Sequence, residues 1–399
     1  MRRRRRSYPY IIRCKRKLRI ELQLNMEESK SERAMLSFWG DVSFGLEVEP
    51  IVEKNGFAYC FDGVRDAFKG SSLNVVNFDC TITEATQKNR FRDGSHLKTK
   101  PAAALAMKQA GIDGVVLANN HIYDYGTQGI EDTMAAFDAA GIQYAGVGKT
   151  AAEALSPMLL EDADGRSVGI ISSCALPVES SDNCPYMVGP FDLDLLKQAI
   201  DNCVDKVDHL IVSIHWGREF VHHPFRSQIE AARQLIDWGA GAVIGHHPHV
   251  VGSVESYGSG YIAYSLGDFV FDQRDHQGIP HRHDALGITL RHADTRVLQG
   301  EYVPVRVDRD YRPVIPVGEV RAGIVEFVEE LSAGLCDLNI AEARASGAAS
   351  VGFLGHQIRS IRKSFINGGL LSVVKKAARV RPVHIKLFFV WLKRKVGKF

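Results

Sequence analysis

Short runs of apolar residues alternate with longer helical patterns along most of the chain, between residue 35 and about residue 306. The runs that predict strands are Met35–Trp39, Leu73–Phe78, Val115–Ala118, Val168–Ser172, His209–Ile214, Ala242–Ile244 and Tyr261–Leu266. The segments between them that predict helices are Pro101–Ala110, Gln128–Ala140, Leu193–Cys203 and Ser227–Trp238. Two further strands, Leu286–Leu290 and Glu301–Val307, are expected to close the domain. This alternation is typical of a layered α/β architecture in which helices cover a sheet.

The pattern becomes helical from about residue 320, with helices expected at Ala322–Leu331, Ile340–Ala345 and Gly355–Phe365. The chain is therefore predicted to have a basic tail over residues 1–34, an α/β domain over 35–320 and a helical, basic extension over 321–399. No apolar run reaches the roughly 18–20 residues that a membrane-spanning helix needs.

The formal net charge of +2 hides a strong asymmetry along the chain. Residues 1–20 contain ten Lys and Arg and residues 356–399 contain twelve, and neither segment contains an acid. The remaining residues have 27 bases against 47 acids, which is a net charge of about −20. A body this acidic argues against nucleic-acid processing, because it repels a phosphate backbone.

Two interpretations of the basic C-terminal tail stay open. Residues Ala377–Phe399 interleave bases with aromatic and aliphatic residues, which suits contact with a membrane surface. The same pattern also fits a terminal helix that packs on the domain and exposes a basic face. The N-terminal arginine run lacks the apolar segment of a secretory signal, and Met26 or Met35 is an alternative start. We therefore expect a protein that is cytoplasmic or peripheral to the inner face of the membrane.

Polar residues follow five of the predicted strands at the point where each strand ends. In chain order these clusters are Gly40-Asp41, Asn77-Phe78-Asp79, Asn119-Asn120-His121 with Asp124, His215-Trp216-Gly217, and Gly245-His246-His247-Pro248-His249. The carboxyl ends of strands in an open α/β sheet meet at one edge, where ligands bind. Carboxylates, an amide oxygen and imidazoles suit Mn, Fe, Zn, Co or Ni. The pattern therefore predicts a metal site of the kind found in two-metal hydrolases.

Some of these residues also have simpler explanations. Asp41 follows a glycine and would suit a turn, and Asn120 would suit the cap of the following helix. His222 and His223 fit a solvated loop pair better than a contact with substrate. No role is assigned to three other histidines, His96, His281 and His283.

Taken together, the motifs resemble the capsule biosynthesis protein CapA family, which is associated with poly-γ-glutamate synthesis and belongs to the calcineurin-like metallophosphoesterase superfamily. The resemblance covers about residues 35–306. It is carried by Gly40-Asp41, Asn77-Phe78-Asp79, the segment Ala118–Gly126, the segment Ile214–Glu219, the segment Ile244–Val250 and the segment Tyr264–Phe269. It implies a four-layer α/β sandwich of the metallophosphoesterase type that holds two divalent metal ions.

The resemblance also implies which residues would hold the two ions. The ligands of the first metal would be Asp41, Asp79 and His249. The ligands of the second would be Asp79 as the bridging carboxylate, Asn120, His215 and His247.

The same motifs imply the residues that would act on the substrate. His121 is similar to the superfamily histidine that assists the leaving group as a general acid. Asp124 would orient His121 by a hydrogen bond, as carboxylates commonly do for histidines beside metals. Arg218 and Glu219 would face the substrate, since an arginine suits bidentate contact with an anion.

Three positions depart from the family pattern. Ser43 stands where the superfamily has a histidine ligand. The first site is therefore expected to bind its metal weakly, or the centre is expected to hold a single metal ion. Asp79 stands where CapA-like sequences usually have a glutamate. Asp268 stands where they usually have an asparagine.

The sequence thus supports a metal-dependent hydrolase in capsule, poly-γ-glutamate or related exopolymer biosynthesis, with a phosphoester or an anionic polymer as substrate. The alternative hypothesis is a non-catalytic, membrane-associated assembly component of a polymer synthase that uses the same domain for binding. A nucleic-acid partner is not expected.

Overall fold

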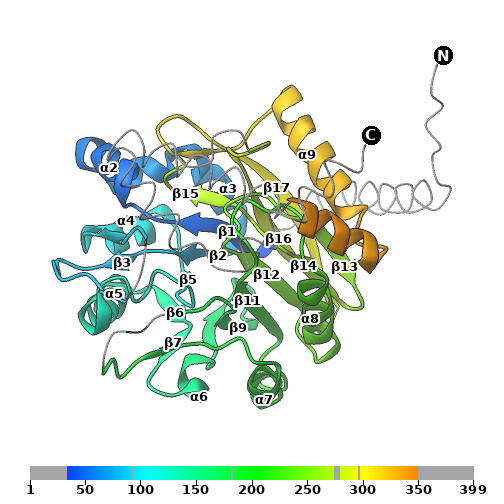
Figure 1. The fold of residues 1–399 in the computed structure, drawn as a ribbon, viewed down its shortest axis with the longest axis horizontal. Helices are drawn as coiled ribbons and strands as arrows, with labels where there is room; N and C mark the ends of the chain where they lie inside the picture. The colour runs from blue at the N-terminus through cyan, green and yellow to red at the C-terminus, as the bar shows by residue number, and fades with distance from the viewer. Residues whose placement is uncertain are drawn as a thin grey trace, which may run out of the picture.

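The computed structural model of the chain describes residues 34–91, 94–178, 180, 183–273, 279–294 and 297–348 (Figure 1). Two large β-sheets form its centre. The first sheet has the order β18-β17-β16-β1-β2-β5-β6, and β15 pairs with the end of β1. Its strands are β1 (Ala34–Val42), β2 (Ser71–Phe78), β5 (Gly114–Val116), β6 (Gln143–Ala145), β15 (Asp268–Val270), β16 (Asp284–Asp294), β17 (Val297–Val307) and β18 (Pro313–Val314). Strands β2, β1, β5, β6 and β15 run parallel, whereas β16, β17 and β18 add antiparallel pairings.

The second sheet has the order β13-β14-β12-β11-β9-β8. Its strands are β8 (Met158–Glu161), β9 (Ser167–Cys174), β11 (His209–His215), β12 (Ala242–His246), β13 (Val254–Tyr257) and β14 (Gly260–Ala263). The four central strands β9, β11, β12 and β14 are parallel. Two short pairs lie outside the sheets, β3 (Thr81–Ile82) with β4 (Lys98–Thr99) and β7 (Val147–Gly148) with β10 (Met187–Val188).

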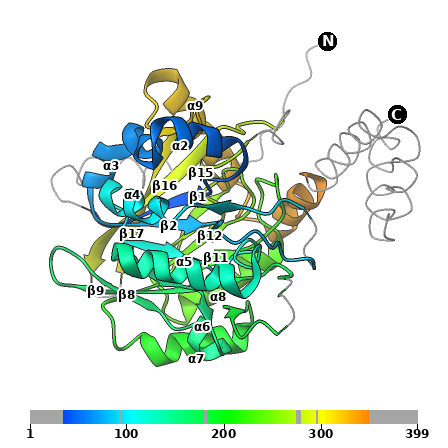
Figure 2. The ribbon, with the colours of Figure 1, turned by 90° about the vertical axis from the view of Figure 1, so that its left-hand side faces the viewer.

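Helices cover the outer face of each sheet. The helices over the first sheet are α2 (Glu49–Asn55), α3 (Arg65–Lys69), α4 (Ala102–Ala110) and α5 (Gly126–Ala140), together with the 3₁₀ segments η1 (Leu46–Val48) and η2 (Phe57–Val64). Those over the second sheet are α6 (Ala151–Ala154), α7 (Leu193–Cys203) and α8 (Arg226–Asp237). Figure 1 shows α4 and α5 apart from α7 and α8 with the strands between them, and Figure 2 shows α6 and α7 below strands β8 and β9.

The alternation of side chains along each strand produces three buried layers. On β11, Leu210 and Val212 face the helices, whereas Ile211 points to the other sheet. There Ile211 belongs to a buried apolar cluster that also contains Phe38 of β1. Because successive side chains of a strand point to opposite faces, a strand buried on both sides needs apolar residues at both positions. The four layers of helices, sheet, sheet and helices confirm the predicted α/β sandwich.

Most predicted elements are present, and one predicted strand is wrong. The apolar run Tyr261–Leu266 does not form a single strand, because β14 ends at Ala263. The chain then turns through Gly267, which has a φ of 73°, and enters β15 of the other sheet. Several short elements were not predicted, among them the strands β6, β8 and β13 and the helices α2, α3 and α6, since segments of three to seven residues carry too little periodicity.

The last described helices pack on the sandwich. Helix α9 (Gly318–Ser332) inserts Ile324 and Val328 into the apolar cluster between the sheets. Residues 338–348 form a further helix, as predicted for Ile340–Ala345. Within the described ranges, no helix combines the length and the apolar character needed to cross a membrane. The predictions for residues 1–33 and for 349–399, including the basic helix and tail, lie outside the described residues.

The crossing of the chain from one sheet to the other leads to a testable prediction at Gly40. A Cβ atom at this position would lie 2.1 Å from the backbone oxygen of Gly267. The backbone cannot move away from this contact without breaking the hydrogen bonds between β1 and its neighbours. Gly40→Ala is therefore expected to lower the free energy of unfolding by about 1–3 kcal/mol, measured by urea denaturation. Gly323→Ala in α9 is the matched control, because no atom lies within 4 Å of its Cβ position. It should stabilise the protein by about 0.5–1 kcal/mol, and equal midpoints for the two variants would contradict the prediction.

Candidate metal centre

The polar strand ends of the two sheets meet between them. Asp41 is the last residue but one of β1 and Asp79 follows β2, so the first sheet supplies carboxylates. His215 ends β11 and His247 follows β12, so the second sheet supplies imidazoles. The exposed fraction of each of these side chains is 6% or less. The convergence follows from parallel strands of both sheets that present their carboxyl ends at the same side of the sandwich.

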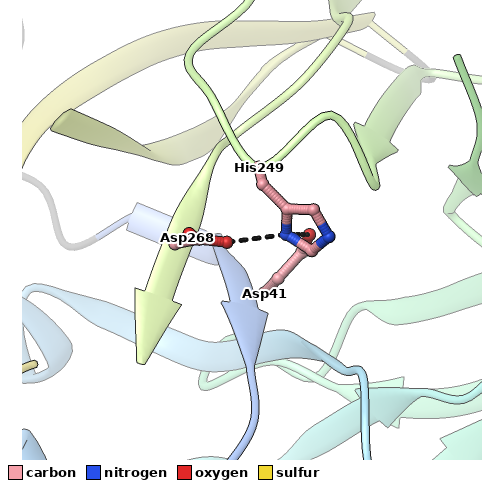
Figure 3. Close-up of side chains that lie close together, drawn as sticks. All are labelled: Asp41, His249 and Asp268. Atoms are coloured by element: carbon pink, nitrogen blue, oxygen red, sulfur yellow. Dashed lines mark hydrogen bonds and ion pairs between the residues drawn. The ribbon is translucent and has the colours of Figure 1, made fainter. Parts of the chain in front are cut away.

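The most compact group of potential ligands consists of Asp41, His249 and Asp268, each of which offers an atom within 4.8 Å of the others (Figure 3). The Nδ1 atom of His249 lies 2.8 Å from Oδ1 of Asp268 and 3.5 Å from Oδ2 of Asp41. The two carboxylates are neighbours because β15 pairs in parallel with β1, in a register that sets Asp41 beside Asp268. This group is able to bind a metal ion.

Asp41 is held in place by three donors. Its Oδ1 atom accepts a hydrogen bond from Nδ2 of Asn77 at 2.9 Å and lies 3.1 Å from Nδ1 of His246. Its Oδ2 atom accepts a bond from the backbone N–H of His247 at 3.2 Å. Burial by itself would raise the pKa of Asp41, but the hydrogen bond and charge of His246, with His249 and Asn77, hold it below its usual value. Asp41 is therefore a carboxylate anion at neutral pH.

The positive charge that balances these carboxylates lies on His249. Burial would lower the pKa of His249, but the charge and hydrogen bond of Asp268, with the charges of Asp41 and Asp79, raise it to about 10. The carboxylates thus create a strongly negative potential in a buried space. A divalent cation bound here would take the place of the proton on His249, because a histidine binds a metal ion in its neutral form.

A second group forms around His215. Its Nε2 atom lies 2.8 Å from Oδ1 of Asn120 and 4.0 Å from Oδ1 of Asp79. The rings of His215 and His247 are 4.9 Å apart between centroids. Burial, followed by the charges of the neighbouring histidines, lowers the pKa of His215 well below its usual value and that of His247 to about 4. Both imidazoles are therefore neutral, which is the form that binds metals.

The backbone of the histidine segment is strained. His247 and His249 have φ angles of 94° and 57°, which residues other than glycine seldom adopt. The loop after β11 is joined to this segment, because the N–H of Phe220 donates to the carbonyl of Pro248 at 2.7 Å. Phe220 also has a positive φ of 63°. Such conformations cost about 1–3 kcal/mol each and cluster at functional sites, where they direct side chains toward a ligand.

His121 and Asp124 form a pair beside the metal ligands. Nδ1 of His121 lies 2.8 Å from Oδ2 of Asp124, and the same oxygen accepts a hydrogen bond from the backbone N–H of Leu97 at 2.5 Å. Asn119 supports the loop, because it accepts from the N–H of His121 and donates to the carbonyl of Phe78. The alternative in which Asn120 caps the next helix is wrong, since α5 begins after Tyr125 and Asn120 reaches His215.

The residues expected to face the substrate lie in the loop after β11, and both are exposed. Glu219 is close enough to His247 for its charge to act on the pKa of that histidine. The guanidinium of Arg218 instead lies 5.7 Å from the ring centroid of Phe225. The structure therefore brings Glu219 toward the ligands and places Arg218 against an aromatic ring.

Other residues discussed from the sequence lie around this centre. Ser43 is buried, and its Oγ atom accepts a hydrogen bond from the backbone N–H of Gly45 at 3.3 Å. His222 is not a solvated loop residue, because it is half-buried and its Nδ1 atom lies 2.7 Å from the carbonyl oxygen of Val251. His281 stacks on Phe327 at 3.8 Å between centroids, which is a packing contact.

Sequence reasoning did not assign three residues that contact the cluster. Asp268 was noted as a departure from the family but not as a ligand, and Asn77 and His246 were not given roles although both hold Asp41. The available signal was the Gly267-Asp268 pair directly after an apolar run, which repeats the pattern of Gly40-Asp41.

The donor set fits a bound divalent ion. Among the described residues, Oδ1 of Asn77 and Nδ1 of His247 are buried and have no hydrogen-bond partner. Unsatisfied buried polar atoms are costly and rare in native proteins, so their presence indicates a ligand that the protein itself does not supply. Carboxylates, an amide oxygen and neutral imidazoles are suitable ligands for borderline divalent metals.

The fold and the site define an α/β-sandwich protein with a candidate metal centre at the carboxyl ends of its strands. Residues 35–273 match the family model of the bacterial capsule synthesis protein PGA_cap. The chain belongs to this family, as its resemblance to CapA indicated.

Curated relatives agree with this assignment. The chain is 32% identical over 263 residues to the capsule biosynthesis protein CapA of Bacillus anthracis, which is 64% of each chain. It is 30% identical over 240 residues to the PGA biosynthesis protein CapA of Bacillus subtilis, covering 59% of this chain and 63% of the relative. A probable polyglutamine synthesis accessory protein of Mycobacterium tuberculosis is 31% identical over 257 residues, which is 59% of this chain and 66% of that protein. The chain thus spans slightly less than two thirds of the length of these relatives.

Proposed function

We propose that this protein is a metal-dependent hydrolase that acts in the biosynthesis of a capsule, poly-γ-glutamate or a related exopolymer. Its substrate would be a phosphoester or a bond in an anionic polymer or its precursor. The observation that carries the proposal is the meeting of buried carboxylates from one sheet with neutral imidazoles from the other, beside the His121–Asp124 pair. The process is suggested by the names of the relatives, which refer to capsule and PGA biosynthesis.

Two groups of residues would hold the metal ions, Mn, Fe, Zn or similar. The first group is Asp41, His249 and Asp268, with Asp79 shared between the groups. The second is Asp79, Asn120, His215 and His247. A bound divalent metal would polarise the scissile group and lower the pKa of a water molecule toward neutrality. Asp268 offers the first site a carboxylate close to Asp41, which offsets the histidine that Ser43 replaces.

The role of the His121–Asp124 pair follows from its hydrogen bonds. The Oδ2 atom of Asp124 faces Nδ1 of His121, which favours the tautomer with its proton on Nδ1 when the ring is neutral. The Nε2 atom is then the position that takes up a proton and gives it to a leaving oxygen. His121 is 8% exposed and Asp124 is fully buried, so the imidazole is the member of the pair that is nearer to solvent. A general acid at this place would assist departure of the alcohol or phosphate product.

The alternative is a non-catalytic component that uses the same domain to bind polymer or to assemble with a synthase at the membrane. One relative carries the word accessory in its name. This alternative predicts that polymer production survives loss of the metal ligands, provided that folding and abundance are unchanged.

The proposal is tested by metal analysis and a substrate panel of phosphomonoester, phosphodiester and poly-γ-glutamate. The wild-type protein is expected to bind divalent metal and to hydrolyse at least one substrate, whereas His247→Ala should lose bound metal and activity. His292→Ala is the control, because His292 is exposed and lies beyond the Leu36–Leu290 pair, at the amino end of β1 and away from the candidate ligands. Absence of metal from the wild type under every loading condition would refute the proposal.

A further inference from the structure

A cavity of about 650 Å³ lies next to the candidate catalytic pair. It is formed by two segments, Ala85–Phe91 from the loop between β3 and β4 and Tyr125–Gln128 at the start of α5. Figure 1 shows β3 beside α5, and the two elements are in contact. Its volume is within the range of ligand-binding clefts. We call the cavity lined by these two described segments the basic groove.

The basic groove is directly connected to the His121–Asp124 pair. The backbone N–H of Asn89 donates to the carbonyl oxygen of Asp124 at 2.9 Å. The other end of the same loop, at Leu97, donates to the side chain of Asp124. Tyr125, which lines the groove, is the next residue in the chain. A ligand lying in the groove would therefore lie against the loop that carries His121 and Asp124.

Among the residues that the structure describes, the lining of the groove contains two exposed cations, Lys88 and Arg90, and no acid. This contrasts with residues 21–355 as a whole, which contain 47 acids against 27 bases. A third cation, Lys98, contacts two residues that line the groove. Its Nζ atom lies 5.1 Å from the ring centroid of Tyr125 and donates a hydrogen bond to the carbonyl oxygen of Ala85.

The backbone adds to the positive potential at the same place. Helix α5 has 15 residues and begins at the groove after Tyr125, which makes no side-chain capping bond. Its first turn contains no acid. The nearby carboxylate of Asp132 already accepts hydrogen bonds from Thr83 and from Gln128 at 2.7 Å. The positive end of the helix dipole therefore reinforces the two exposed cations.

The groove also has an apolar element that indicates the form of its ligand. The ring of Phe91 is 41% exposed, and the Arg90 guanidinium lies 4.8 Å from its centroid. Exposed cations beside an exposed ring suit a flexible chain in which carboxylates alternate with methylene groups. A compact inorganic anion would use the charges but not the ring.

We propose that the basic groove binds a linear polymer with a carboxylate on each repeat and guides it to His121. This inference rests on the proposed function for the identity of the polymer, although the groove itself is defined by its own cavity and charges. The groove would be a binding site for the polymer chain that is separate from the metal ligands. Lys88 and Arg90 would contact carboxylates of the polymer.

The test is the binding of a fluorophore-labelled, short γ-linked glutamate oligomer to the full-length protein, followed by fluorescence anisotropy. Replacing both cations, Lys88→Ala with Arg90→Ala, is expected to weaken binding roughly tenfold. The matched control is Arg65→Ala with Lys69→Ala on α3, which removes the same charge from exposed ion pairs directly before the amino end of β2. The control should bind the oligomer as the wild type does.

A second pair of variants separates binding from folding. Thr127→Glu places a carboxylate in the first turn of α5, where it favours the helix but repels an anionic ligand. Thr127→Gln has the same size without the charge. Weaker binding by Thr127→Glu than by Thr127→Gln, with equal thermal unfolding, supports the groove, whereas equal binding by the two variants contradicts it.

Three further outcomes decide the proposal. Equal affinity of the wild type and the Lys88, Arg90 double variant would overturn it, as would a wild type that does not bind the oligomer. Tighter binding of a polyphosphate of similar length would assign the groove to a phosphate polymer instead. The measurement is repeated with Asp41→Asn, and retained binding there shows that the groove is independent of the metal ligands. A failure of the hydrolase proposal is thereby distinguished from a failure of this one.

Discussion

Asp41→Asn is expected to abolish hydrolysis and to reduce the affinity of the protein for divalent metal by more than about 100-fold. The side chain keeps its size, so the change removes charge rather than volume. Asp41 is the residue on which both polar groups depend, because it meets His246, His249 and Asn77 within 3.5 Å. Loss of its charge leaves His249 facing Asp268 and weakens the attraction for a cation. Metal content by mass spectrometry and initial rates on the responsive substrate measure the effect.

The control for this variant is Asp201→Asn, an equal change at an exposed ion pair with Lys197. Surface ion pairs of this kind contribute little, so metal content and rate should equal those of the wild type. Full metal occupancy in Asp41→Asn, with unchanged activity, would contradict the role of Asp41 as a ligand. The simpler explanation for its position after Gly40, a turn, is wrong, because Asp41 lies within β1 and pairs with Asp268 of β15.

His121→Ala is expected to lower kcat by about 100-fold to 10,000-fold while leaving the metal content unchanged. The imidazole contacts Asp124 at 2.8 Å and is not among the proposed metal ligands. A residue that acts only on proton transfer should change kcat more than KM. Single-turnover rates measure the loss in the chemical step, and metal analysis of the same preparation measures the metal content.

The leaving group distinguishes general acid catalysis from a structural role of His121. A nitrophenolate departs without a proton, so His121→Ala should reduce the rate only slightly on a nitrophenyl ester. An alkoxide needs a proton, and the full loss should appear on an alkyl ester of the same acid. Equal losses on both esters would contradict the general acid role. Asp124→Asn should show the same preference in weaker form, because it disturbs the orientation of the ring but keeps the imidazole.

Much of the fold was accessible from the pattern of apolar residues. Strands such as β11, which is buried on both faces, appear as continuous apolar runs, and the longer helices have enough turns to show their period. The prediction for the run Tyr261–Leu266 was wrong. A buried segment that leaves one sheet for another has the same continuous apolar sequence as a single buried strand. Gly267 was the residue that marked the turn, and a glycine by itself does not predict one, because glycines also occur in helix caps, bulges and close backbone contacts.

The candidate ligands were accessible for a different reason. Polar residues directly after buried strands are costly unless they have partners, so their position in the sequence is informative without any structure. Asp41, Asp79, His215 and His247 were found in this way. Asp268 was not, since its proximity to Asp41 depends on the pairing of β15 with β1 across more than two hundred residues. The roles of Asn77 and His246 likewise depend on contacts between sheets.

The amino-acid sequence by itself determined the layered α/β class, the polar strand ends and the family. Each of these depends on residue type and on spacing over a few turns or strands. The tertiary structure alone decided that carboxylates come from one sheet and imidazoles from the other. It also decided that His249 lies between two carboxylates, and that the basic groove lies beside the loop that carries His121. These features depend on contacts between residues that are far apart in the sequence. The same local pattern of residues is compatible with other strand pairings until the two sheets pack together.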